Sequence, residues 1–94
     1  MNEMSPFLDP HRLRSLRQRR RMRARDVARK ARISDAQLYR LERGERPNVA
    51  AVTLARVALA LGTSVEYLLG LTDDVRSFQE VLSQRGEQGD DHGV

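Results

Sequence analysis

The chain has 94 residues, of which 39% are hydrophobic and 32% are charged, and its net charge is +4. This length allows one small domain, and an aromatic content of 4% without Trp favours helices over a β-sandwich or barrel. Cys is absent, which excludes a disulfide framework and a thiolate metal site. No apolar run reaches the ~18–20 residues of a membrane span, and residues 1–10 do not match a secretory signal, so we expect a cytoplasmic protein.

The first two predicted helices lie in the most basic part of the chain. Asp9 is a suitable N-cap and Pro10 a suitable first residue for a helix that runs to about Arg21. A short second helix is predicted at residues 24–31, because its small apolar residues recur on one face.

A third helix is predicted to begin at Ser34. Residues 34–37 match a capping box, in which a Ser hydroxyl and a Gln amide each satisfy an N–H group at the start of a helix. Leu38 and Leu41 form its apolar stripe, and Gly44 can adopt the left-handed conformation that ends a helix.

The second half of the chain predicts three further helices. Residues 49–61 are the most apolar stretch and are expected to form the core helix. Its inward residues are expected to be Val52, Leu54, Val57, Ala58 and Leu61. A short helix is expected at residues 64–69, and a sixth from Asp73 to about Gln84. No strand pattern and no internal repeat is apparent in the sequence.

The predicted fold is therefore all-α. It comprises an N-terminal arm at residues 1–9, a compact five-helix domain at 10–72, a C-terminal helix at 73–85 and a disordered tail at 86–94. The C-terminal helix carries more apolar surface than a five-helix core needs, so we expect it to form a homodimer. The candidate dimerisation residues are Leu71, Val75, Phe78, Val81 and Leu82. The alternative is that this helix folds back onto its own domain.

Charge is distributed unevenly along the chain. Residues 11–32 carry a net charge of +10, whereas residues 63–94 carry −5. A cationic face of this kind attracts a polyanion, of which nucleic acid is the commonest. The alternative interpretation is a solvated, Arg-rich surface without a partner.

The helices predicted at residues 24–31 and 34–43 are joined by about three residues, which is the pattern of a helix-turn-helix. In this motif the second helix can lie in the major groove of DNA while the first crosses the backbone. An ordered set of segments extends the pattern: Leu13–Arg17, Val27–Ala31, Ile33–Ser34, Leu38–Gly44, Leu54–Gly62 and Ser64–Gly70.

From about Arg12 to Thr72 the chain resembles the phage-repressor or Cro-like (XRE-type) helix-turn-helix regulators. The resemblance implies a five-helix domain that binds double-stranded DNA sequence-specifically, usually as a homodimeric repressor on a palindromic operator. Two positions depart from the family pattern. Arg23 and Ala24 stand where a small capping residue and Gln are common, and Arg32 stands in the turn where Gly is favoured.

The side of the third helix opposite Leu38 and Leu41 is expected to face the DNA groove. The candidates for base contact are Asp35, Ala36, Tyr39 and Arg40. The candidates for phosphate contact are Arg23, Arg25, Arg29, Ser34, Arg43, Gly44 and Arg46. By the same resemblance, Arg17 and Glu42 match a pair that forms a structural ion pair in relatives.

The sequence does not predict an enzyme, a metal site or a cofactor. The two histidines, His11 and His92, lie in a surface helix and in a Gly-rich tail, and the six glycines are too scattered for a phosphate-binding loop. The fold leaves one other function open, that of an antitoxin or coactivator-type module whose main task is to bind a protein partner.

Overall fold

The computed structural model describes residues 7–45 and 48–89. Over these residues the chain forms six helices and no strand, which confirms the predicted all-α fold. The helices are α1 (Pro10–Arg19), α2 (Ala24–Ala31), α3 (Asp35–Glu42), α4 (Ala51–Leu61), α5 (Val65–Leu68) and α6 (Phe78–Gly89). In the described segments, none of these helices is long and apolar enough to cross a membrane.

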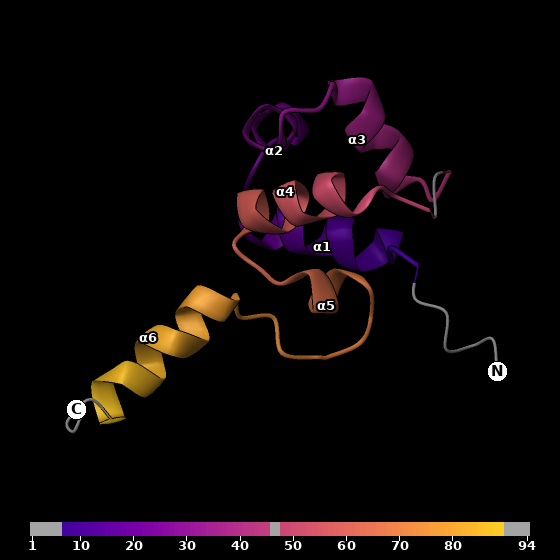
Figure 1. Cartoon of the computed structure of the whole chain (residues 1–94). Helices are drawn as coiled ribbons and strands as arrows, with labels where there is room; N and C mark the ends of the chain where they lie inside the picture. Colours follow the sequence, from indigo (N-terminus) through magenta and orange to yellow (C-terminus); the bar gives the residue numbers. More distant parts are fainter. Residues whose placement is uncertain (1–6, 46–47, 90–94) are drawn as a thin grey trace, which may run out of the picture.

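Helices α1 to α5 surround one core, while α6 leads away from them (Figure 1). The largest fully buried side chains come from all five helices: Leu13, Val27, Leu38, Val57, Leu61 and Leu68. Leu8 is also buried, so the chain joins the core before α1 begins. The expected arm at residues 1–9 is therefore too long by at least this residue, and its residues 1–6 lie outside the described part.

Helix α1 begins as predicted but ends earlier. The Asp9 carboxylate accepts hydrogen bonds from the N–H groups of His11 and Arg12, at 3.0 and 3.3 Å. The helix ends at Arg19 rather than Arg21, because Arg21 adopts a left-handed conformation with φ 57°. This turn redirects the chain so that Ala24, the first residue of α2, is buried in the core.

Helix α4 begins at Ala51 and contributes its apolar face to the core. Leu54, Val57, Ala58 and Leu61 are buried at helical spacing, but Val52 is 61% exposed. The expectation that Val52 lies in the core is wrong. Two residues before Leu54, it lies nearly on the opposite side of the helix.

Helix α6 begins and ends later than predicted. It runs from Phe78 to Gly89 instead of from Asp73 to about Gln84, so it includes the first four residues of the expected tail. A second capping box sets its start: the Ser77 N–H donates to Glu80 at 2.9 Å, and the Glu80 N–H donates to the Ser77 hydroxyl at 3.1 Å. The rest of that expected tail, residues 90–94, lies outside the described residues.

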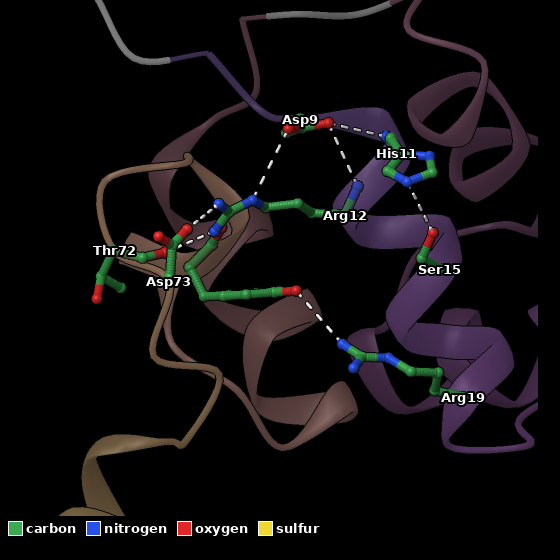
Figure 2. A network of polar contacts seen from close by, with 8 residues as sticks. Asp9, His11, Arg12, Ser15, Arg19, Thr72 and Asp73 are labelled. Atoms are coloured by element: carbon green, nitrogen blue, oxygen red, sulfur yellow. Dashed lines mark hydrogen bonds and ion pairs between the residues drawn. The ribbon is translucent and has the colours of Figure 1, made fainter.

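Arg12 attaches the segment before α6 to the five-helix body. Its guanidinium donates to the carbonyl oxygens of Tyr67 and Thr72, at 3.1 and 2.5 Å, and lies 2.6 Å from the Asp73 carboxylate (Figure 2). It also lies 4.5 Å from the centroid of the Tyr67 ring. These contacts hold residues 72 and 73 against α1 and α5, and the next helix begins only at Phe78.

The candidate dimerisation residues differ in their exposure. Leu71, Phe78 and Leu82 are exposed, whereas Val75 and Val81 are half-buried. Val75 packs against the core of its own chain, and its carbonyl oxygen accepts a 2.6 Å hydrogen bond from the buried Thr63. Val75 therefore helps to anchor this segment to the body, and the exposed apolar surface of α6 begins at Phe78.

The turn between α2 and α3 has a left-handed residue that is not glycine. Arg32 has φ 60° and ψ 43°, and its N–H donates to the Arg29 carbonyl oxygen at 3.2 Å. The next N–H, of Ile33, donates to the Ala28 carbonyl oxygen at 3.0 Å. This geometry is typical of the glycine-ended helix, so the chain keeps the usual turn although its left-handed residue is an arginine.

Replacing Arg32 by glycine is expected to stabilise the protein by about 0.5–1 kcal/mol. The substitution removes the left-handed strain of ~1–2 kcal/mol, and the greater freedom of glycine in the unfolded chain cancels part of this gain. Arg29→Gly is the matched control, because it removes the same charge inside α2 and is expected to destabilise by about 1 kcal/mol. Urea denaturation of both variants measures the difference, and equal losses of stability would contradict the prediction.

Candidate nucleic-acid interface

Helices α2 and α3 pack against each other through their apolar faces. Val27, Ala28 and Ala31 of α2 are buried, and so are Leu38 and Leu41 of α3. Only Arg32, Ile33 and Ser34 separate the two eight-residue helices. The two helices lie next to each other at one end of the body, and their remaining sides face away from the core (Figure 1).

The outer side of α3 carries the four candidates for base contact. Asp35, Ala36, Tyr39 and Arg40 are all exposed, and Tyr39 keeps 47% of its surface in solvent. They extend along the helix on the side away from Leu38 and Leu41. The arrangement presents one carboxylate, one methyl group, one phenol and one guanidinium to a partner.

The start of α3 is fixed by the predicted capping box. The Ser34 N–H donates to the Gln37 side-chain oxygen at 3.1 Å, and the Gln37 N–H donates to the Ser34 hydroxyl at 3.0 Å. In this bond the Ser34 hydroxyl is an acceptor, so its own hydrogen can still be donated to an anion. The cap thus sets the orientation of the helix without using up the donor of Ser34.

At the end of α3, an acidic residue lies beside the predicted phosphate contacts. The Glu45 carboxylate is 2.7 Å from the Arg43 guanidinium, and both side chains are exposed. This hydrogen bond lowers the pKa of Glu45 and raises the pKa of Arg43, and the charge of Arg40 lowers the pKa of Glu45 further. Glu45 was not among the sequence candidates, although an acid two residues after a candidate arginine is a visible signal.

Gly44 serves a structural purpose at this position. Its N–H, proposed from the sequence to meet a phosphate, already donates to the Leu41 carbonyl oxygen at 3.2 Å. Its φ is 75°, and a Cβ atom here would come within 3.1 Å of the Pro10 side chain. Glycine is therefore required by the turn and by the close approach of α1. Arg46, the last phosphate candidate, lies outside the described residues.

The three phosphate candidates of α2 are exposed arginines. Arg23 lies at the N-cap and is 3.6 Å from the Asp26 carboxylate, while Arg25 and Arg29 project from the first and last turns. Arg23 does not cap α2 with its side chain, and no other side-chain cap is found there within the described chain. The first N–H groups of α2 consequently add a partial positive charge to that of the arginines.

A small cavity separates α3 from the start of α4. Its volume is about 230 Å³, and Arg40 and Gln37 line one side of it while Asn48 and Thr53 line the other. Helix α4 also begins without a side-chain cap, because Ala50 is its N-cap. The polar side chains of Asn48 and Thr53, which are not among the predicted site residues, therefore extend the polar surface from α3 toward α4.

Arg17 and Glu42 form a bidentate ion pair between α1 and α3. The two N···O distances are 2.6 and 3.0 Å, and a third guanidinium nitrogen donates to the Met22 carbonyl oxygen at 3.1 Å. The side chain of Glu42 is 5% exposed and that of Arg17 is 14% exposed. The hydrogen bond to Glu42 raises the pKa of Arg17, against the effect of burial.

Removing one partner of this pair is expected to destabilise the domain strongly. Arg17→Ala leaves the Glu42 carboxylate buried without its partner and should cost about 3–5 kcal/mol. The double variant Arg17→Met/Glu42→Leu removes both charges and should cost much less. Thermal unfolding of the single and double variants tests this, and additive losses would show that the two residues are not coupled.

The geometry agrees with a comparison against known protein families. Residues 11–76 match the family model described as a helix-turn-helix domain, which covers α1 to α5 and the segment that Arg12 holds. Searches of the curated proteins and of the solved structures found no match. Since the family model covers more than half of the chain, the protein belongs to the helix-turn-helix domain family.

Proposed function

We propose that the protein is a sequence-specific regulator of the phage-repressor or Cro-like type. It binds double-stranded DNA in the cytoplasm as a homodimeric repressor on a palindromic operator, without catalysis or cofactor. The observation that carries the proposal is the exposed outer side of α3, which presents Arg40 and three other candidate residues away from the buried leucines. The arginines of α2 flank it and supply the charge that a polyanion needs.

In this proposal α3 reads the base edges in the major groove. Arg40 is the main reader, since its guanidinium can bond guanine O6 and N7 together. Ala36 contacts a thymine methyl group, and Tyr39 reaches a phosphate or base edge with its hydroxyl. Asp35 stabilises the positive end of the helix dipole and can accept a hydrogen bond from cytosine.

Phosphate contacts hold the protein in register on both sides of α3. Arg23, Arg25 and Arg29 face the backbone at α2, together with the first N–H groups of that helix. Ser34 donates its hydroxyl hydrogen, and Arg43 contacts the backbone at the other end of α3. Such contacts position a protein on DNA without reading its sequence.

Substitution of Arg40 and Arg43 separates base reading from phosphate binding. We expect Arg40→Ala to cost about 1–3 kcal/mol of binding free energy and to relax the preference at one base pair of each half-site. We expect Arg43→Ala to weaken all duplexes alike and to lower the salt slope by about 1 per subunit. Titrations on an operator selected from random DNA, its single-base variants and unrelated DNA measure both.

The wild-type chain is the reference for this experiment. Its affinity should fall about 10³–10⁵-fold between ~50 and ~200 mM salt if the dimer contacts ~6–10 phosphates. A duplex affinity that does not change with salt concentration, or no binding to any duplex, would refute the DNA-binding proposal. If Arg40→Ala kept its base preference and lost affinity uniformly, Arg40 would be a phosphate contact instead.

Glu45→Gln is expected to strengthen binding to all duplexes. The substitution removes a negative charge beside the DNA backbone and releases Arg43 from its 2.7 Å ion pair. The gain should be several-fold at low salt, should shrink as salt rises, and should be smaller when Arg43 is also alanine. Asp26→Asn is the matched comparison, because it removes the same charge beside another candidate arginine, Arg23. The ion pair there is longer, at 3.6 Å, so the gain in affinity should be smaller. An unchanged or weaker affinity in Glu45→Gln would contradict a role for Arg43 at the backbone.

A further inference from the structure

A basic cavity lies between the turn before α2 and the last turn of that helix. Its volume is about 310 Å³, and the exposed residues Arg21, Arg29 and Lys30 supply three cations to its wall. Met22 and Asp26 complete the lining. At ~30 Å³ per water molecule the cavity has room for about ten waters, so a hydrated anionic group fits into it.

The positive charge of this cavity is not balanced by the acids of the protein. Among the side chains that the structure describes, Arg21, Arg29 and Lys30 take part in no ion pair. Asp26 is the one carboxylate of the lining, and it lies 3.6 Å from Arg23, which does not line the cavity. The three cations repel one another, and a bound anion would relieve this repulsion.

The arginines before this turn are used in a different way. Arg19 donates to the Tyr67 hydroxyl at 3.4 Å (Figure 2), and Arg20 donates to the Gly62 carbonyl oxygen at 3.2 Å. Arg21 follows them in the left-handed conformation, with φ 57°, and lines the cavity. Two arginines of this run therefore hold the body together, while the third is presented to solvent.

Arg21 adopts this conformation at an energetic cost. Positive φ is found in the described chain at three glycines and at two arginines, Arg21 and Arg32, which lie on either side of α2. Glycine reaches this region without strain, whereas a Cβ atom makes it unfavourable. Strained backbone positions are concentrated at ligand sites. At Arg21 the side chain that glycine would lack is a cation of the cavity.

The cavity adjoins the surface that is proposed to meet the DNA backbone. Arg29 belongs to both, because it lines the cavity and lies one turn after Arg25 on the exposed side of α2. Arg21 and Lys30 were not among the candidates from the sequence. They extend the proposed backbone surface from α2 toward the turn that precedes it.

We propose that Arg21, Arg29 and Lys30 form a phosphate-binding site at the edge of the helix-turn-helix. The inference rests on the proposed DNA binding and adds a backbone contact at the turn before α2. A phosphate group offers several acceptor oxygens, which arginine can bond in pairs and lysine can bond as a point charge. The bound duplex and a free phosphate ester carry the same group, and the sharing of Arg29 favours the duplex.

The salt dependence of operator binding tests this site in the full chain. Lys30→Gln and Arg21→Gly should each weaken binding about five- to tenfold per subunit at ~0.1 M salt and lower the salt slope by about 1 per subunit. Arg14→Gln is the matched control, because this exposed arginine of α1 does not line the cavity, and it should leave the slope unchanged. Urea denaturation should show Arg21→Gly to be at least as stable as the wild type, so its weaker binding would not come from unfolding.

A scan of the DNA backbone identifies the phosphate that is bound. A neutral methylphosphonate replaces one phosphate at a time in the selected operator and its flanks, and each contacted position loses affinity for the wild-type chain. At one position of each half-site this loss should be much smaller for Lys30→Gln and Arg21→Gly, because either change removes the same contact. Arg14→Gln should show the wild-type loss at every position.

A titration with inorganic pyrophosphate, without DNA, tests the other source. Saturable binding that Lys30→Gln and Arg21→Gly abolish, with no methylphosphonate position that depends on them, would assign the site to a free phosphate ester. If neither measurement depended on Lys30 or Arg21, the cavity would not be a phosphate site and the inference would be wrong. A wild-type chain that binds no duplex would refute the proposed function, and the pyrophosphate titration would still decide this inference.

Discussion

The orientation of α3 depends on the ion pair between Arg17 and Glu42. The bidentate contact joins the last turn of α1 to the last residue of α3, and Arg17 also donates to the carbonyl oxygen of Met22 before α2. One side chain thus connects three elements of the motif. Because Glu42 is almost fully buried, the pair has few alternative arrangements, and the outer side of α3 is presented in one direction.

The proposed DNA-binding surface carries two features that lower stability or affinity by themselves. Arg32 holds a left-handed conformation that glycine would adopt without strain, and Glu45 places a carboxylate beside Arg43. Arg32 adds positive charge to the basic face at the turn, whereas Glu45 reduces the net positive charge at the end of α3. Both features are expected where a surface is shaped by binding and not by stability alone.

Much of the fold and of the candidate interface was predictable from local signals. The capping box at Ser34, the stripe of Leu38 and Leu41, and the short connection to α2 require only neighbouring residues, and together they place Arg40 on the outer side. The start of α6 was predictable in the same way from Ser77 and Glu80, but the apolar pattern beginning at Val75 suggested an earlier start. Where periodicity and a capping signal disagreed, the hydrogen bonds of the cap determined the boundary.

The sequence by itself therefore determined the number and order of the helices and most of their buried residues, because these depend on spacings of three or four residues, and it located the positive charge along the chain. Only the tertiary structure decided which distant groups meet. The Arg12 guanidinium donates to the carbonyl oxygens of Tyr67 and Thr72, and the Thr63 hydroxyl donates to that of Val75. These bonds anchor the segment between α5 and α6 to the body, and α6 leads away from there (Figure 1). Such contacts join residues far apart in the chain to backbone atoms that every residue has, and no sequence pattern marks them.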